Sequence, residues 1–297
     1  MFFASRSKSG GFSRMNSMMD QRSQLAIWLD ATERYLVCRT LSKWLPLYVV
    51  AEYPKSGGTW LCQMLAAALE VPFPRNRRIR YASCIVHGHY LYSEGLFSKQ
   101  PSHAICMIRD GRDIMVSLYF HSLFENERTS AHVVRRTRSA LAFQDCEDVS
   151  ENLPKFIEYV FDRQRKSRSP FQFTWPQFVR SWSGRDVGFV KYEELIHDTL
   201  GVLRKTVERI AAKPINSNRL QEIVDEFSFA RQASRQPGVE NRNSFLRKGV
   251  AGDWQNNFSI EARRVFDELA GEELILLGYE SNRSWVDATS NSTSVRA

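Results

Sequence analysis

Residues 47–69 read LYVVAEYPKSGGTWLCQMLAAAL, and this stretch decides the fold. Residues 47–53 are mainly apolar, which predicts a buried strand, and residues 60–69 carry Leu, Met and Ala at helical spacing, which predicts a helix. Between them, Pro54 ends the strand, and two glycines let the backbone turn with its N–H groups pointing inward. This order of strand, glycine turn and helix predicts an α/β protein with a phosphate-binding loop.

The turn also supplies positive charge. Lys55 precedes the run Ser56-Gly57-Gly58-Thr59, and the helix N-terminus adds its positive dipole end at the same place. In a Walker A loop the lysine follows the glycines, so a nucleoside triphosphatase needs a different order. An ordinary strand, tight turn and helix without a ligand is the other interpretation of this stretch.

The composition suits one large α/β domain, since the 297 residues are 43% hydrophobic and 25% charged. We predict a disordered N-terminal arm over residues 1–20, the domain over 21–280 and a flexible C-terminal tail over 281–297. We recognise neither a signal peptide nor a membrane-spanning stretch, and we expect a cytoplasmic protein. Five scattered cysteines indicate a reducing compartment and no metal cluster.

The net charge is +8, from 41 Lys and Arg against 33 Asp and Glu, and basic residues gather at 75–80, 135–138 and 163–168. Such a surplus fits a polyanionic cofactor, an anionic acceptor, an anionic membrane surface or nucleic acid, although most charge runs are solvated faces. No nucleic-acid-binding motif is recognisable, so nucleic acid is not an expected partner.

Residues 21–45 predict a helix, with Leu25, Trp28, Leu29 and Leu36 on related faces. An amphipathic helix usually covers a core, and we expect this one to pack on the domain. Peripheral contact with the inner face of a membrane is the alternative role.

A second strand is predicted within residues 81–92, with His87 and His89 at its far end. Two positions apart on a strand, these side chains point to one face. Two histidines without a third ligand nearby do not predict a metal site.

A third strand is predicted over residues 104–108, followed by a charged turn and a helix from residue 114. Arg109 at the strand end and Ser117 in the helix can both reach an anion that lies along the sheet edge. The alternatives are a turn closed by its own Arg–Asp ion pairs, or a Walker B strand that ends near Asp110.

The rest of the chain alternates helices with one more strand. Residues 120–178 are polar, basic and mainly helical, and we predict that they form an excursion over the binding cleft. Residues 187–195 predict a strand that includes Tyr192, and residues 219–234 predict a helix that includes Phe229.

Residues 235–258 predict a long loop before the final helix at 260–279. Long loops are usually functional or disordered. Arg247, Lys248 and Gly249 let two cations and the backbone approach a phosphate, which favours a functional loop.

Four separated blocks together resemble the sulfotransferases that use 3′-phosphoadenosine 5′-phosphosulfate (PAPS), of the cytosolic type and its bacterial relatives. The blocks are YPKSGGTW (53–60), RDGRDIMVS (109–117), VKYEEL (190–195) and RKGVAGDWQNNF (247–258). The resemblance spans about residues 45–280. It implies a single α/β domain in which helices flank a central parallel sheet of the P-loop type.

The resemblance also implies site residues. The 5′-phosphosulfate would be held by the loop and the helix start, namely Lys55, Ser56, Gly57, Gly58, Thr59 and Trp60, with Trp60 near the adenine. The 3′-phosphate would be held by Arg109, Ser117, Arg247, Lys248 and Gly249. Tyr192 and Phe229 match positions that line the adenine pocket.

The implied reaction moves the sulfuryl group to a hydroxyl or amine of an acceptor, without a metal. A histidine base takes the acceptor proton, while Lys55 stabilises charge on the bridging oxygen. The candidates for the base are His87 and His89, and the spacing from Arg109 favours His87. A small molecule, a glycan and a lipid all stay open as acceptors.

Two departures from the family pattern concern Gly58 and the C-terminal part. Gly58 stands where the animal enzymes usually have Thr, which removes one hydroxyl contact. The dimer signature of those enzymes is not recognisable around residues 258–268, so the oligomeric state stays open.

The main alternative function is a P-loop kinase or another nucleotide-binding protein. It would require a Mg²⁺ site built from a loop Ser or Thr and a Walker B acid, and Asp110 follows an arginine that opposes a divalent cation. A protein that binds nucleic acid or an anionic surface is a third class, supported by the net charge.

Overall fold

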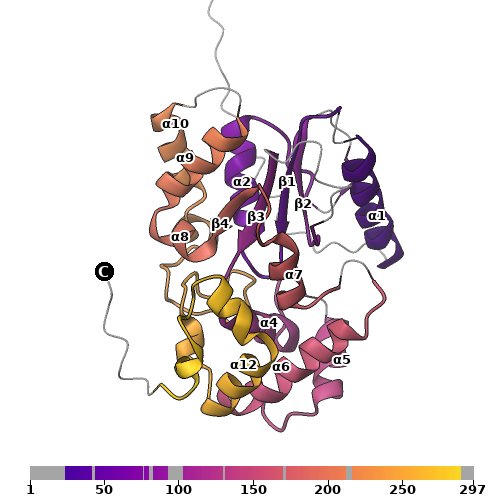
Figure 1. The fold of residues 1–297 in the computed structure, drawn as a ribbon, viewed down its shortest axis with the longest axis vertical. Coiled ribbons are helices and arrows are strands. Elements are labelled where there is room, and N and C mark those ends of the chain that lie inside the picture. The colour runs from indigo at the N-terminus through magenta and orange to yellow at the C-terminus, as the bar shows by residue number, and fades with distance from the viewer. Residues whose placement is uncertain are drawn as a thin grey trace, which may run out of the picture.

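Four parallel strands form the centre of the fold, in the order β2-β1-β3-β4 (Figure 1). They are β1 (Leu47–Glu52), β2 (Cys84–Gly88), β3 (Ala104–Ile108) and β4 (Gly188–Lys191). Nearly every residue of β1, β2 and β3 is buried, as expected for parallel strands covered on both faces. The predicted single α/β domain around a parallel sheet is confirmed.

This computed structural model describes residues 24–41, 44–75, 77–79, 83–92, 103–129, 131–169, 172–211 and 216–288. Within them, β1 lies between β2 and β3, with Val50 opposite His87 and Val49 opposite Ala104. The next strand in the chain, β2, therefore lies on one side of β1, and the strand after it, β3, lies on the other side. Such a switch point opens a crevice at the carboxyl ends of the strands. The turns after β1 and β3 carry Lys55 and Arg109 to this crevice.

One face of the sheet is covered by α2 (Gly58–Leu69), α8 (Tyr192–His197), α9 (Thr199–Ile210) and α10 (Ser217–Glu226). Their apolar side chains pack on Val50, Ile105 and Val190 of the strands. The predicted strand over 187–195 ends earlier, because α8 begins at Tyr192 directly after β4. The predicted helix over 219–234 is divided into α10 and the short α11 (Phe229–Ala233).

The other face carries an aromatic core. It is built by α4 (Gly111–Leu123), α6 (Val149–Arg165), α7 (Trp175–Trp182) and α12 (Ile260–Leu276), with α5 (Ala131–Leu141) beside them in the lower part of Figure 1. Phe156, Phe161, Trp175 and Phe266 are buried there. We predicted residues 120–178 to cover the binding cleft, and this is wrong for α5, α6 and the start of α7. The large side chains of α6 and α7 instead pack against α12, and α5 packs against α4 and α6.

The helix α1 (Gln24–Leu41) packs on the domain, but not through the predicted leucine face. Cys38 is fully buried, and Asp30 pairs with Arg78 at 3.1 Å. Three leucines of the predicted face are exposed, by 65%, 43% and 51%: Leu25, Leu29 and Leu36. The side chain of Trp28 and residues 21–23 lie outside the described part. No helix in the described residues is both long and apolar enough to span a bilayer.

The C-terminal segment is packed further than we predicted. A 3₁₀ turn, η4 (Arg283–Val286), places Trp285 in the core, where 5% of the residue is exposed. Its indole N–H donates to Asp267 at 3.1 Å, and its ring centroid lies 5.8 Å from that of Trp254. The predicted tail therefore does not begin at residue 281. Residues 1–20 and 289–297 lie outside the described part.

We expect Trp285→Ala to lower the free energy of unfolding by about 3–5 kcal/mol, because a buried indole and its hydrogen bond are lost. Trp44→Ala is the matched control, since Trp44 is 66% exposed, and it should change the value by less than about 0.5 kcal/mol. Urea denaturation followed by circular dichroism measures both. Equal small losses would contradict the packing of the C-terminal segment.

Candidate functional site

The loop between β1 and α2 holds two residues in the left-handed region, Lys55 with φ 73° and Gly57 with φ 96°. Glycine adopts this conformation freely, whereas lysine does so at an energetic cost that is common at functional sites. A Cβ on Gly57 would lie 2.7 Å from the Tyr192 ring, so the loop needs glycine there for space as well. The hydroxyl of Ser56 is buried and has no hydrogen-bond partner among the described residues.

Glu52 lies beneath this loop and ties it to β2. Its carboxylate accepts the backbone N–H of Gly58 at 2.5 Å and lies 2.6 Å from Nε2 of His87. A Cβ on Gly58 would meet the same carboxyl carbon at 2.7 Å. Burial raises the pKa of Glu52, but the charge and hydrogen bond of His87 outweigh it and keep that pKa below its usual value. The sequence analysis missed Glu52 because it reads as the last residue of a strand.

Lys55 is surrounded by other cations. Burial, followed by the charges of Arg109 and Arg128, lowers the pKa of Lys55 to about 7, while Glu52 acts in the opposite direction. An anion bound beside Lys55 would therefore favour its protonated form.

Arg109 joins two loops at the switch point. Its Nη1 donates to the carbonyl of Lys55 at 3.1 Å, and its Nη2 donates to the carbonyl of Val250 at 3.3 Å. The guanidinium carbon lies 4.1 Å from the ring centroid of Tyr192. Its Nε is buried and has no partner among the described residues. Arg109 can therefore still donate to an anion in the crevice.

The loop at 235–258 is fastened to α4 by Asp113. The carboxylate of Asp113 accepts the backbone N–H groups of Gly252 at 2.7 Å and Trp254 at 2.8 Å. Two buried donors of the loop are thereby satisfied. This attachment holds the preceding residues of the loop over the crevice.

Asp253 orients the two cations of this loop. Arg247 and Lys248 both donate to its buried carboxylate, and Arg247 also pairs with Glu240. Burial raises the pKa of Asp253, but the hydrogen bonds from Lys248 and Arg247 outweigh it and lower that pKa. Gly249 has φ 67°, and a Cβ there would lie 2.4 Å from the Phe229 ring.

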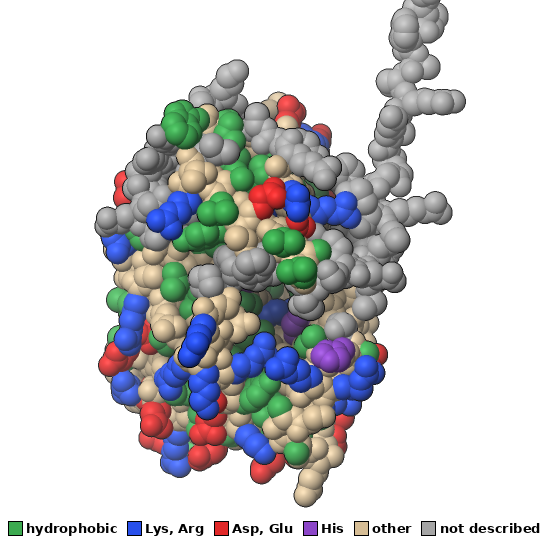
Figure 2. Space-filling view, turned by 90° about the vertical axis from the view of Figure 1, so that its right-hand side faces the viewer, with side chains coloured by type: hydrophobic (Ala, Val, Ile, Leu, Met, Phe, Trp, Pro, Cys, Tyr) green, Lys and Arg blue, Asp and Glu red, His purple; other side chains and the backbone are tan. Residues whose placement is uncertain are grey.

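These segments enclose a cavity of about 150 Å³. Most of the predicted site residues line it, namely Lys55, Gly57, Thr59, Trp60, Arg109, Ser117, Tyr192, Phe229, Arg247, Lys248 and Gly249. The sequence analysis missed other lining residues, namely Glu52, Gln63, Arg128, Ile196, Gln232, Phe245, Leu246 and Val250. On the surface, Lys and Arg side chains gather around a hollow that also exposes His (Figure 2).

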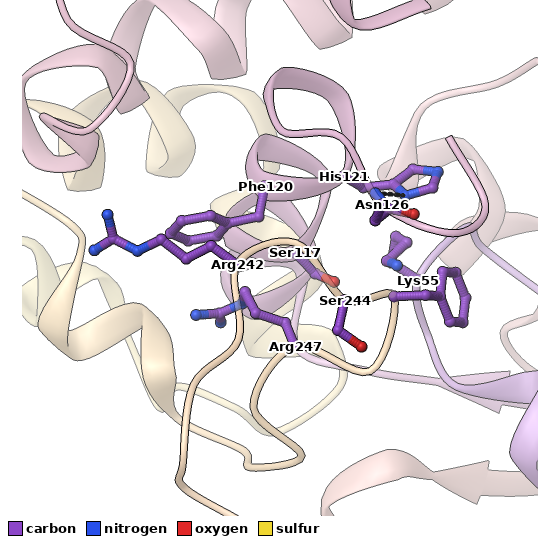
Figure 3. Close-up of a pocket in the computed structure, with 9 residues that line it drawn as sticks. Lys55, Ser117, Phe120, His121, Asn126, Arg242, Ser244 and Arg247 are labelled. Atoms are coloured by element: carbon purple, nitrogen blue, oxygen red, sulfur yellow. Dashed lines mark hydrogen bonds between the residues drawn. The ribbon is translucent and has the colours of Figure 1, made fainter. Parts of the chain in front are cut away.

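A smaller pocket adjoins this cavity and shares Lys55 and Ser117 with it. Figure 3 shows Ser117 and His121 of α4 around the same space as Ser244 and Arg247 of the loop. Burial, followed by the charge of Lys55, lowers the pKa of His121 to about 3. Its neutral ring is therefore a wall of the site that sequence patterns did not indicate.

Four predicted residues do not line the cavity: Ser56, Gly58, His87 and His89. Ser56 and Gly58 are buried inside the loop. His87 is 6% exposed and contacts Glu52, whereas His89 lies just beyond the strand with Nδ1 3.1 Å from the carbonyl oxygen of Glu52. Both histidines thus contact Glu52, which itself lines the cavity.

A glycine loop at a helix N-terminus, a sheet switch point and converging cations define the class, an α/β protein that binds phosphate or sulfate groups. A family model described as "Sulfotransferase domain" matches residues 74–278. The chain belongs to the sulfotransferase family. The matched residues begin after the phosphate loop, so the loop assignment depends on its own geometry and chemistry.

Among curated relatives, "Sulfotransferase 2B1" of Rattus norvegicus is 23% identical over 256 residues, which cover 80% of this chain and 66% of that protein. The Homo sapiens protein of the same name is 24% identical, with coverage of 73% and 63%. The chain thus spans just under two thirds of these relatives.

Two solved structures share the fold. Mouse sulfotransferase SULT7A1 complexed with PAP (adenosine 3′,5′-bisphosphate) has a TM-score of 0.57 at 21% identity. The match covers 83% of this chain and 90% of the mouse chain. Retinol dehydratase in complex with androsterone and inactive cofactor PAP has a TM-score of 0.53 at 16% identity, with coverage of 84% and 85%.

We expect Lys55→Met to stabilise the ligand-free protein near pH 7, since it removes a buried cation. The pKa of Lys55 is about 7 in the folded state against 10.5 in the unfolded chain, so between these values the unfolded chain binds more protons. The stability of the wild type should therefore rise with pH, and the advantage of the variant should shrink toward pH 10. Urea unfolding across this range measures the difference. Lys205→Met, on the exposed side of α9, is the control, and an advantage independent of pH would contradict the burial of Lys55.

Proposed function

We propose that this protein is a PAPS-dependent sulfotransferase that moves the sulfuryl group to a hydroxyl or amine of a small-molecule acceptor. One observation carries the proposal. A single cavity brings the phosphate loop, Arg109 and Ser117, and the run Arg247–Gly249 together from three distant parts of the chain. Cations from three parts of the chain in one cavity suit a nucleotide with phosphate groups at both its 3′ and 5′ positions.

The donor would lie across the switch point. Lys55 and the N–H groups of the loop would bind the 5′-phosphosulfate, and the buried hydroxyl of Ser56 is suited to the same group. Arg109, Ser117, Arg247 and Lys248 would bind the 3′-phosphate. The solved structure of retinol dehydratase contains PAP as an inactive cofactor, which supports this donor.

Aromatic rings are available for the adenine. The rings of Trp60 and Tyr192 lie edge to face with centroids 6.5 Å apart. The indole N–H of Trp60 donates to the carbonyl of Phe227 at 2.8 Å, which fixes its ring. Phe229 packs against Gly249, so the adenine and the 3′-phosphate would bind to the same wall of the cavity.

In the reaction, the acceptor oxygen attacks sulfur in line with the bridging oxygen. A new O–S bond forms, the bond from sulfur to the bridging oxygen breaks, and PAP leaves. Lys55 and the loop N–H groups stabilise the charge that develops on the leaving phosphate. The acceptor proton passes to a histidine.

We favour His89 as this base. Its Nδ1 lies 3.1 Å from the Glu52 carbonyl oxygen, which can only accept, so Nδ1 carries the proton and Nε2 keeps its lone pair. Burial lowers the pKa of His89, which keeps the ring neutral near pH 7. The family spacing favoured His87, but Nε2 of His87 is already engaged by the Glu52 carboxylate. His87 would then position Glu52 and the loop.

We expect adenosine 3′,5′-bisphosphate (PAP) to stabilise the protein in a thermal-shift titration, by about 2.7 kcal/mol at 100 times its dissociation constant. ADP, which lacks the 3′-phosphate, should bind more weakly. Arg247→Ala should weaken PAP about tenfold or more and leave ADP nearly unchanged, because a charge-assisted contact to the 3′-phosphate is lost. Stabilisation by ATP–Mg²⁺ alone would instead favour a kinase.

For the base, we expect His89→Ala to lower turnover about 10²- to 10⁴-fold while PAP affinity is kept. Sulfuryl transfer from PAPS to a panel of phenols and alcohols, measured as PAP release, gives the rate. His87→Ala is the comparison, and it should weaken PAP binding as well, because it releases Glu52 and the loop. If His87→Ala abolished turnover with normal PAP binding while His89→Ala stayed active, the two roles would be reversed.

A further inference from the structure

Arg128 is a cation of the cavity that has no role in the proposed donor site. It lines the cavity together with Lys55 and Phe245. Its guanidinium carbon lies 3.8 Å from the ring centroid of Phe245, and Nζ of Lys55 lies 3.8 Å from the same centroid. One phenyl ring therefore connects Arg128 to the lysine at the proposed reacting centre.

The turn that carries Arg128 is held by its own hydrogen bonds. Asn126 and Thr129 form an isolated bridge, and Oδ1 of Asn126 accepts the backbone N–H of Arg128 at 3.0 Å. Nδ2 of Asn126 donates to Oγ1 of Thr129 at 3.0 Å, and the same oxygen lies 2.8 Å from Nδ1 of His121 on α4. The backbone of Arg128 is thus positioned before any ligand binds.

The charge of Arg128 is poorly compensated. Its Nη1 is buried and has no acceptor among the described residues. The carboxylate oxygens of the adjacent acid, Glu127, both lie 3.0 Å from the backbone N–H of Phe245, and no hydrogen bond joins Glu127 to Arg128 among the described residues. Burial and then the positive charge of Arg75 lower the pKa of Arg128 to about 10, and they outweigh the charge of Glu127, which raises that pKa. A desolvated cation of this kind favours the binding of an anion.

The anions of the proposed donor already have other partners. Its 3′-phosphate would face Arg109, Arg247 and Lys248, and its 5′ group would face Lys55 and the loop. Arg128 is therefore available to a second molecule in the same cavity.

Building on the proposed function, we propose that the acceptor is an anionic hydroxyl compound whose carboxylate, sulfate or phosphate group binds Arg128. The planar guanidinium can donate two parallel hydrogen bonds to such a group, which would orient the acceptor as well as hold it. Arg75 would add to the attraction. A neutral molecule of the same shape would leave Arg128 desolvated and unpaired, so it would bind more weakly.

The test compares two probes of one shape, 4-hydroxybenzoate and its methyl ester, titrated by calorimetry into the PAP-loaded protein. We expect the wild type to bind the acid about tenfold or more tightly than the ester, because a hydrogen bond between charged groups contributes about that much to affinity. Arg128→Gln should abolish this preference, and Arg128→Lys should retain part of it. Arg209→Ala is the control, because it removes an arginine that pairs with Asp186 at 2.9 Å on the surface, and it should behave like the wild type.

The PAP affinity of each variant separates the possible failures. Unchanged PAP affinity in Arg128→Gln is expected, whereas a loss of tenfold or more would assign Arg128 to the donor and overturn the proposal. Wild-type protein that binds acid and ester equally, or binds neither, would overturn it as well. A wild type that does not bind PAP would contradict the proposed function itself.

Discussion

The hydrogen bonds of Arg109 hold the site together. Its guanidinium donates to the carbonyls of Lys55 and Val250, which lie 54 and 141 positions away in the chain. One side chain at the end of β3 thereby sets the distance between the phosphate loop and the loop at 235–258. Both carbonyls would lose a charged donor without it, and each buried polar group left unpaired destabilises the fold.

Positive charge is concentrated in the site, and some of the cations there are paired with acids more closely than others. Asp253 and Glu240 pair with the cations of the long loop, and Asp113 lies 3.7 Å from Arg109. Among the described residues, the charge of Glu52 opposes those of Arg109, Arg128 and Arg247 at Lys55. Like charges held together lower the stability of the ligand-free protein, and an anionic ligand relieves that repulsion. The binding of an anion and the stability of the fold are therefore coupled through Lys55.

Local patterns were sufficient where the residues themselves dictate the backbone. The apolar run of β1, the glycines of the loop and the buried β3 were predicted because strands and left-handed turns admit few residue types. Local patterns were insufficient for α1, where leucines at helical spacing indicated a buried face that is exposed in the structure. That helix packs through Cys38 and the Asp30–Arg78 ion pair instead. Likewise, the aromatic residues of α6 and α7 did not reveal that they fill the core rather than cover the cleft.

The sequence by itself determined the parallel α/β domain, the glycine loop from Lys55 to Trp60 and the cations at 247–248. These features depend on residues that are close together in the chain, so a local pattern is enough to predict them. Only the tertiary structure decided the roles of Glu52, Arg128 and Phe245, which read as ordinary strand and loop residues. Burial and electrostatic potential depend on neighbours that folding brings from distant parts of the chain. No local pattern records those distances, so these three residues were recognised as cavity residues only in the folded protein.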